Sequence, residues 1–174
     1  EARAARGLVR AAPLGPPILP PVRTLGLRDR ALALDRVRLL GVLNLTPDSF
    51  SDGGRYLDPE RALERAREMV AEGADILDLG AESTRPGAAP VPVEEEKRRL
   101  LPVLEAVLSL GVPVSVDTRK PEVAEEALKL GAHLLNDVTG LRDERMVALA
   151  ARHGVAAVVM HMPVPDPATM MAHA

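Results

Sequence analysis

Short apolar runs alternate with helical patterns along most of this chain. Five of these runs are apolar on both faces, as buried parallel strands are, and lie at about 40–44, 75–79, 113–117, 133–137 and 155–161. Amphipathic segments with helix start and stop residues follow the first four, at about 59–72, 93–110, 121–130 and 143–152. The repeat of strand, loop and helix predicts βαβ units in an α/β fold.

Local residues refine these elements. Asp58-Pro59-Glu60 places an N-cap, a first-turn proline and an acidic residue in order, and Gly73 predicts the end of that helix. Pro102 lies inside the second helix and predicts a kink or an early break. Residues 31–40 alternate weakly around Asp35-Arg36, which suggests a short hairpin before the first strand.

Polar residues follow the apolar runs where each strand is expected to end. Asn44, Asp78, Asp117, Asn136-Asp137 and His161 occupy these positions. The carboxyl ends of successive parallel strands converge on one face of an α/β barrel, and active sites are built there. The pattern therefore predicts an enzyme with a TIM (β/α)8 barrel, of which the chain covers roughly the first five strands.

Composition narrows the class of protein. The chain has 174 residues, 47% of them hydrophobic, so a substantial core in one domain is expected. Net charge is -3 without a basic block, and aromatic content is 1%, so we expect neither nucleic acid nor a membrane surface as a partner. Cysteine is absent, which excludes disulfides and thiolate chemistry and fits a cytoplasmic location.

The two ends of the chain differ from its middle. Residues 1–30 are rich in proline, alanine and arginine and are predicted to form an extended arm, with residues 31–174 belonging to the barrel domain. Asp166-Pro167 marks the start of another helix shortly before Ala174. Because five strands cannot close an eight-stranded barrel, we expect the domain to be truncated at its C-terminus.

Two loops have both a structural and a functional interpretation. Residues 44–54 are a turn-rich connector by composition, but Phe50 is a large aromatic in a chain nearly free of aromatics and is typical of a lid that contacts a ligand. In the next loop Arg85, between Thr84 and Pro86, is either a solvated arginine or an anion ligand.

The strand ends leave similar alternatives open. Asp117 closes a buried strand and needs a partner, which is either Arg119 or a cationic or hydrogen-bonding ligand. Asn136 can recognise a heterocycle edge or cap the following turn. His161 has no ligand-spaced neighbour that would make a zinc site, so a buried, hydrogen-bonded histidine is the better interpretation.

Taken together, these motifs resemble the dihydropteroate synthases, pterin-binding enzymes of folate biosynthesis and targets of sulfonamides. The resemblance spans about Leu39 to His161, and Ala81 is a mild departure, since the family often has glycine there. It is carried by Gly41-Val-Leu-Asn-Leu-Thr-Pro-Asp-Ser-Phe-Ser-Asp-Gly-Gly54, Gly73-Ala-Asp-Ile-Leu-Asp-Leu-Gly-Ala-Glu-Ser-Thr-Arg-Pro-Gly87, Val114-Ser-Val-Asp-Thr-Arg119 and Asn136-Asp-Val-Thr-Gly140.

The resemblance implies condensation of 6-hydroxymethyl-7,8-dihydropterin pyrophosphate with 4-aminobenzoate through an SN1-like pterin cation, in a homodimer. It also implies a role for each matched residue. Asn44 would bind Mg²⁺ and pyrophosphate, and Asp117 would stabilise the cation. Phe50 and Asp52 would act from the first loop, and Thr84, Arg85 and Pro86 would shape the aminobenzoate pocket. Asp117, Asn136, Val138 and Met160 would bind or line the pterin.

Two rival functions remain open. A pterin-binding methyltransferase that passes a folate methyl group to a corrinoid would share the pterin-binding Asp and Asn, but it has no need of the Ser83-Thr84-Arg85-Pro86 loop. A non-catalytic pterin-binding scaffold is the other. The presence of Asn44, Arg85 and Asp117 argues for the synthase.

Overall fold

The computed structural model describes residues 2–3, 10–11, 23–50, 57–83 and 87–159. Its main sheet is parallel, with strands in chain order. They are β5 (Leu40–Asn44), β6 (Ile76–Gly80), β7 (Val114–Asp117), β8 (Leu134–Asp137) and β9 (Ala156–Val159). Each lies within the predicted run or one residue from it, and positions 160–161 of the last run fall outside the described residues. The α/β prediction is confirmed.

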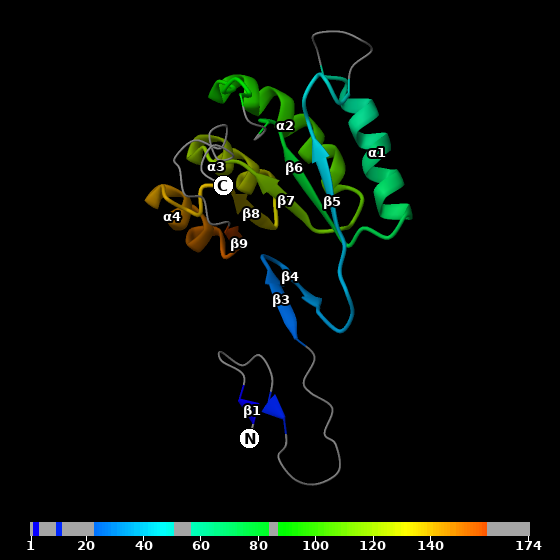
Figure 1. Ribbon diagram of the computed structural model, residues 1–174, viewed down its shortest axis with the longest axis vertical. Coiled ribbons are helices and arrows are strands. Elements are labelled where there is room, and N and C mark those ends of the chain that lie inside the picture. The colour runs from blue at the N-terminus through cyan, green and yellow to red at the C-terminus, as the bar shows by residue number, and fades with distance from the viewer. Residues whose placement is uncertain (1, 4–9, 12–22, 51–56, 84–86, 160–174) are drawn as a thin grey trace.

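Four helices follow the strands and pack against one another in sequence around the outside of the sheet (Figure 1). This is the arrangement expected of successive right-handed βαβ units. The helices are α1 (Pro59–Ala71), α2 (Val93–Leu108), α3 (Pro121–Leu130) and α4 (Glu144–His153).

The helix ends largely follow the residues that predicted them. The Asp58 side chain accepts a hydrogen bond from the backbone N–H of Glu60, as an N-cap does. Pro102, in contrast, does not end α2, which continues to Leu108, so the predicted early break is wrong. Leu100, Val103, Leu104 and Val107 of α2 are fully buried. Burying each such side chain contributes about 1.5–3 kcal/mol, which together exceeds the cost of about 3 kcal/mol for an interior proline.

The helices cover one face of the sheet. The other face, which no described helix covers, is called the open face, although Asp78 and Ser115 at its centre are buried. Leu43, Leu79 and Val116 point toward the helices and are buried in the main hydrophobic core. Leu40 and Val42 alternate with them on the other face and are about half exposed. Because side chains alternate along a strand, every polar residue in register with Val42 or Asn44 belongs to this open face.

An antiparallel hairpin lies at the amino ends of the strands (Figure 1). It consists of β3 (Thr24–Leu27) and β4 (Arg30–Ala33), so the hairpin predicted around Asp35-Arg36 was placed too late. Its turn is at Arg28-Asp29, and Arg28 has a φ of 32°, a conformation that residue type alone does not suggest. Two further short strands, β1 (Ala2–Arg3) and β2 (Arg10–Ala11), pair with each other.

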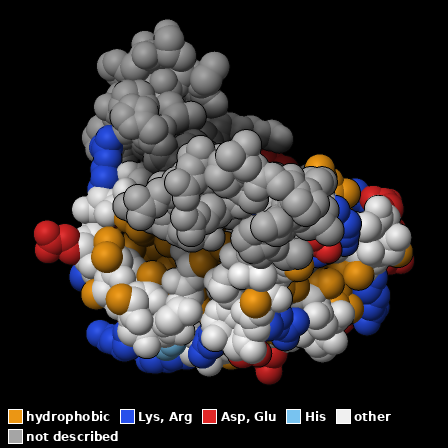
Figure 2. All heavy atoms as spheres, turned by 90° about the horizontal axis from the view of Figure 1, so that it is seen from below, with side chains coloured by type: hydrophobic (Ala, Val, Ile, Leu, Met, Phe, Trp, Pro, Cys, Tyr) orange, Lys and Arg blue, Asp and Glu red, His pale blue; other side chains and the backbone are white. Residues whose placement is uncertain are grey.

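The hairpin is attached to the sheet by side chains at its turn. Leu27 is buried with Ile76 and Leu134 in a second hydrophobic cluster. Arg28 donates to the backbone carbonyls of Leu128 and Ala132, at the end of α3. Cations are favourable at helix C-termini, where carbonyl groups are unpaired. The hairpin therefore covers the end of the sheet opposite to the predicted site. Viewed from below, the molecule shows hydrophobic and basic side chains side by side on its surface (Figure 2).

No helix in the described part of the chain is long and apolar enough to cross a membrane.

We expect acid to destabilise the fold through His133. This side chain is buried; its Nδ1 accepts from the N–H of Val114 at 3.1 Å, which requires the neutral ring. Burial and the nearby Arg30 lower the pKa of His133 below its ordinary value, so the unfolded state takes up a proton first as pH falls. The free energy of unfolding should therefore decrease as pH falls below about 6.5.

Urea unfolding at several pH values measures this effect. His133→Asn keeps an acceptor near the Val114 N–H but cannot take up a proton, so its stability should depend less on pH than that of the parent in this range. Equal pH dependence in the two proteins would contradict the assignment.

Candidate active site

One row of paired residues crosses the carboxyl ends of the parallel strands. Asn44 is in register with Gly80, Gly80 with Asp117, and Asp117 with Asn136. Residues in register on neighbouring parallel strands point to the same side of the sheet, and this row is on the open face. The fold thus brings together Asn44, Asp117 and Asn136, three of the residues that the sequence singled out.

Gly80, which has no side chain, leaves room in the row for the side chain of Asp117. A Cβ atom added at Gly80 would lie 3.4 Å from the Cβ of Asp117 and 3.5 Å from its Oδ2. Any larger side chain at this position would extend over the Asp117 carboxylate. The absence of a side chain keeps the space between Asn44 and Asp117 open for a ligand.

Asp78 lies two residues before Gly80 in β6, on the same face as the row, and is in register with Ser115. Its side chain is only 3% exposed, and its Oδ1 has no hydrogen-bond partner among the described residues. The Oδ2 atom is 3.5 Å from Nδ2 of Asn136, which is a long contact. Burial raises the pKa of Asp78, although hydrogen bonds from Ser115 and Asn136 act in the opposite direction. A buried carboxylate this poorly paired is expected where a ligand supplies the missing donor.

Asp117 is the most strongly perturbed carboxyl group at this edge. Burial, and then repulsion from Asp78, Asp137 and two glutamates, raises its pKa to about 7. An arginine partner would have lowered the pKa instead. Arg119 donates its Nε to Glu82 at 3.1 Å, so the interpretation of Asp117 as an ion pair with Arg119 is not supported.

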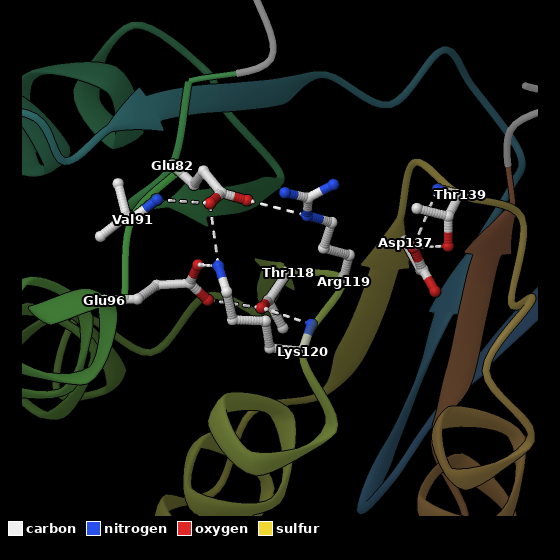
Figure 3. A network of polar contacts seen from close by, with 8 residues as sticks. All are labelled: Glu82, Val91, Glu96, Thr118, Arg119, Lys120, Asp137 and Thr139. Atoms are coloured by element: carbon white, nitrogen blue, oxygen red, sulfur yellow. Dashed lines mark hydrogen bonds and ion pairs between the residues drawn. The ribbon is translucent and has the colours of Figure 1, made fainter. Parts of the chain in front are cut away.

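Asn136 and Asp137 have different roles. Asp137 is fully buried and accepts hydrogen bonds from both the N–H and the hydroxyl of Thr139, which forms the turn after β8 (Figure 3). The turn is therefore stabilised by Asp137. Asn136 has its side chain beside Asp78 on the open face, and Val138, which follows these residues, is buried.

The loop after β5 and the loop after β6 both line a cavity of about 600 Å³ at the same end of the sheet. Phe50 lies at the end of the described part of the first loop, where its side chain packs against the main core. Its backbone carbonyl accepts from the N–H of Asp58 at 2.7 Å. Contact between Phe50 and a ligand stays a prediction. The cavity is lined by Thr46, Pro47, Asp48, Ser83, Gly87, Ala88, Ala89, Pro90, Val91, Pro92, Glu95 and Arg99.

Several predicted site residues lie outside the described part of the chain. These are Asp52, Thr84, Arg85, Pro86, Met160 and His161. Conversely, sequence reasoning noted Asp78 only as the end of an apolar run and did not select it as a site residue. The available sign was its spacing, because Asp78 stands two residues before Gly80 and therefore on the same face of the strand.

Comparison with known proteins gives a consistent set of similarities. Residues 40–174 match the model of a family described as pterin binding enzyme. The dihydropteroate synthase of Bacillus subtilis is 50% identical over 129 residues, which cover 73% of this chain and 45% of that protein.

Solved structures agree in fold. A dihydropteroate synthase from Thermus thermophilus in complex with 4-aminobenzoate has 88% sequence identity and a TM-score of 0.74, covering 87% of this chain and 53% of that one. The enzyme from the same organism in complex with 6HMPPP has 84% identity and a TM-score of 0.72, covering 88% and 52%. The chain thus spans about half the length of these relatives. Its described sheet and helices correspond to part of their α/β barrel.

The repulsion between Asp78 and Asp117 can be measured directly. Asp78→Asn removes one of the charges that disfavour ionisation of Asp117, so the pKa of Asp117 should fall from about 7 toward its ordinary value. Titration of the Asp117 side-chain carboxyl carbon by NMR, in the parent and in the variant, reports this change. A midpoint unmoved by the substitution would show that the two groups do not interact.

Proposed function

The chain belongs to the family of pterin binding enzymes, and from this we propose that it carries part of the active site of a dihydropteroate synthase. The reaction would join 6-hydroxymethyl-7,8-dihydropterin pyrophosphate to 4-aminobenzoate, giving 7,8-dihydropteroate and pyrophosphate. The observation that carries the proposal is the row of Asn44, Gly80, Asp117 and Asn136 above the buried Asp78, in a chain similar to enzymes of that name.

The chemistry of the row suits a pterin. A pterin ring presents several N–H donors and ring acceptors along one edge, and a carboxylate next to a carboxamide offers complementary groups. Burial disfavours negative charge on both Asp78 and Asp117, and at Asp117 repulsion from Asp78 adds to this effect. Donors from a bound ring would relieve that cost, so these carboxylates favour a ligand rich in N–H groups.

The same carboxylates support bond cleavage. When the C–O bond to pyrophosphate breaks, the electron pair leaves with the pyrophosphate and a positive charge develops on the pterin methylene group. The ionised Asp117 would stabilise that charge from a fixed, partly buried position. The amine of 4-aminobenzoate then forms the C–N bond and loses a proton to restore neutrality.

Among the described residues, the available oxygen donors fit a supplementary role in binding a metal ion. No group of three or more His, Asp or Glu residues that could hold a metal occurs in the described part of the chain. Asn44 is exposed at the end of β5 and offers one neutral oxygen. Mg²⁺ takes oxygen ligands, often mainly from substrate phosphates, so Asn44 fits as a single supplementary ligand. When bound, Mg²⁺ would neutralise charge on the leaving pyrophosphate.

The rival functions are less well supported. Similarity to proteins named dihydropteroate synthase, together with the Ser83-Thr84-Arg85-Pro86 sequence, favours the synthase over a corrinoid-dependent methyltransferase. A scaffold would not need the space that Gly80 leaves above Asp117. By the same family relationship, we propose that the intact protein is a homodimer inhibited by sulfonamides that occupy the aminobenzoate position.

Loss of the Asp117 charge should lower turnover strongly with little effect on the fold. We expect Asp117→Asn in the intact protein to lower kcat/KM at least about 100-fold, because a preorganised charge next to the developing cation is lost. The melting temperature should change little, since Asp117 forms no ion pair with a described residue. Pyrophosphate release and thermal unfolding are the two measurements.

A matched control is Asp35→Asn, at an exposed aspartate near the hairpin. It should retain parental turnover. Full activity in Asp117→Asn would refute the role of Asp117, and a scaffold would have no turnover to lose.

Binding of the pyrophosphate substrate should depend on Mg²⁺ through Asn44. We expect Asn44→Ala to weaken the Mg²⁺-dependent part of binding, as measured by calorimetry with and without the metal, because one oxygen ligand is removed. A Mg²⁺ dependence identical to that of the parent would exclude Asn44 as a ligand.

A further inference from the structure

One carboxylate connects the two ends of the loop between β6 and α2. Glu82 follows β6, and its Oε2 accepts a hydrogen bond from the backbone N–H of Val91 at 2.8 Å. Val91 is buried shortly before α2 begins at Val93. A single side chain therefore ties together Glu82 and Val91, which stand on either side of this loop in the sequence (Figure 3).

Lys120 forms an ion pair with the Glu82 carboxylate. Its Nζ donates to Oε2 of Glu82 at 2.9 Å and to Oε1 of Glu96 at 2.8 Å. The Lys120 side chain is 17% exposed, and that of Glu96, on α2, is 1% exposed. The second Glu96 oxygen accepts from the hydroxyl of Thr118 at 2.5 Å. The network joins the end of β6, the residues after β7 and the first turn of α2 (Figure 3).

The network is balanced in charge. Two carboxylates, Glu82 and Glu96, face two cations, Lys120 and Arg119. Burial acts to raise the pKa of Glu82, but Lys120, the Val91 N–H and Arg119 hold it below the ordinary value. A buried ion network is weak evidence for stability, because apolar residues of similar size often serve equally well. Its directional hydrogen bonds do determine geometry, which here means the position of the two loop ends.

The loop that is held in this way lines the cavity at the carboxyl end of the sheet. Ser83, Val91 and the intervening residues Gly87 to Pro90 line one side of it, and Thr46 to Asp48 from the first loop line another. Glu82 itself is not among the lining residues. Its effect on a ligand would therefore be exerted through the loop.

We propose that Glu82, Lys120 and Glu96 form a positioning staple, in which Lys120 and Glu96 orient Glu82 so that Ser83 and Gly87 to Pro90, which line the cavity, are correctly placed for the second substrate. The proposal rests on the proposed function and concerns the 4-aminobenzoate side of the site. Because Asn44, Asp117 and Asn136 are held by the strands themselves, loss of the staple should affect 4-aminobenzoate much more than the pterin substrate.

Two lysines of the same helix region provide the test. Lys120→Met breaks the staple, whereas Lys129→Met removes a lysine that is 58% exposed and 3.6 and 3.7 Å from Glu125 and Glu126. In the intact protein, Lys120→Met should raise KM for 4-aminobenzoate about 10- to 100-fold, because small displacements of a positioning element are costly. KM for the pterin pyrophosphate should change less than about threefold, as expected when one substrate contact is lost selectively. Lys129→Met should match the parent in both.

Lys120→Arg should restore most of the 4-aminobenzoate affinity, since arginine can also pair with two carboxylates. If Lys120→Met does not fold, Glu82→Gln is the second variant, because it keeps the side-chain shape and leaves Lys120 paired with Glu96. It should show the same selective increase in KM.

The outcomes separate the two proposals. A parent protein without 4-aminobenzoate-dependent pyrophosphate release would overturn the proposed function itself. An active parent in which Glu82→Gln or a folded Lys120→Met raises both KM values equally, or neither, would overturn the staple while leaving the function intact. A lower melting temperature without the selective KM change would show a purely structural role.

Discussion

The parallel register of β5 to β8 is the constraint on which the candidate site depends. It brings Asn44, Asp117 and Asn136 onto one row, although they are far apart in the sequence. No side-chain interaction among these residues is needed to bring them together, because the backbone ladder and the burial of the opposite face already do so. A slip of one residue in β7 would turn Asp117 toward the helices and Val116 toward the ligand. The apolar core behind the sheet therefore protects the site as much as it stabilises the fold.

Carboxylates at this end of the sheet fall into two electrostatic classes. Glu82 is neutralised by Lys120 and Arg119, and its pKa is lowered. Asp78 and Asp117 have no such cation among the causes of their shifts, and their pKa values are raised. Among the described residues, Lys120 and Arg119 pair with the carboxylate beside the loop, whereas Asp78 and Asp117 on the open face form no ion pair. Such a difference is typical of a boundary between structural and ligand-binding groups.

Much of this architecture could be predicted from residue patterns. Caps and glycines at Asp58, Gly131 and Gly154 mark helix ends because their backbone conformations and side-chain acceptors are local properties. The hairpin was misplaced because its turn contains Arg28 with positive φ instead of a residue that favours turns, and its position depends on contacts with residues about a hundred positions away. The staple is equally non-local: Glu82, Glu96 and Lys120 look like ordinary surface charges until the fold joins them.

If the proposed function holds, the two classes of carboxylate also explain how one site would bind a dihydropterin and release an anionic leaving group. Asp117, with a pKa raised to about 7, is partly protonated near neutrality when the site is empty. A ring that donates N–H groups favours the ionised form, so binding the pterin would release a proton and leave a carboxylate beside the reacting carbon. The charge that stabilises the cation would thus be fully formed only after the substrate is in place. The staple of Glu82, Lys120 and Glu96, with Arg119 paired to Glu82, would not take part in this change, because its charges are already paired. Glu82 and Val91 would therefore stay tied together throughout the reaction.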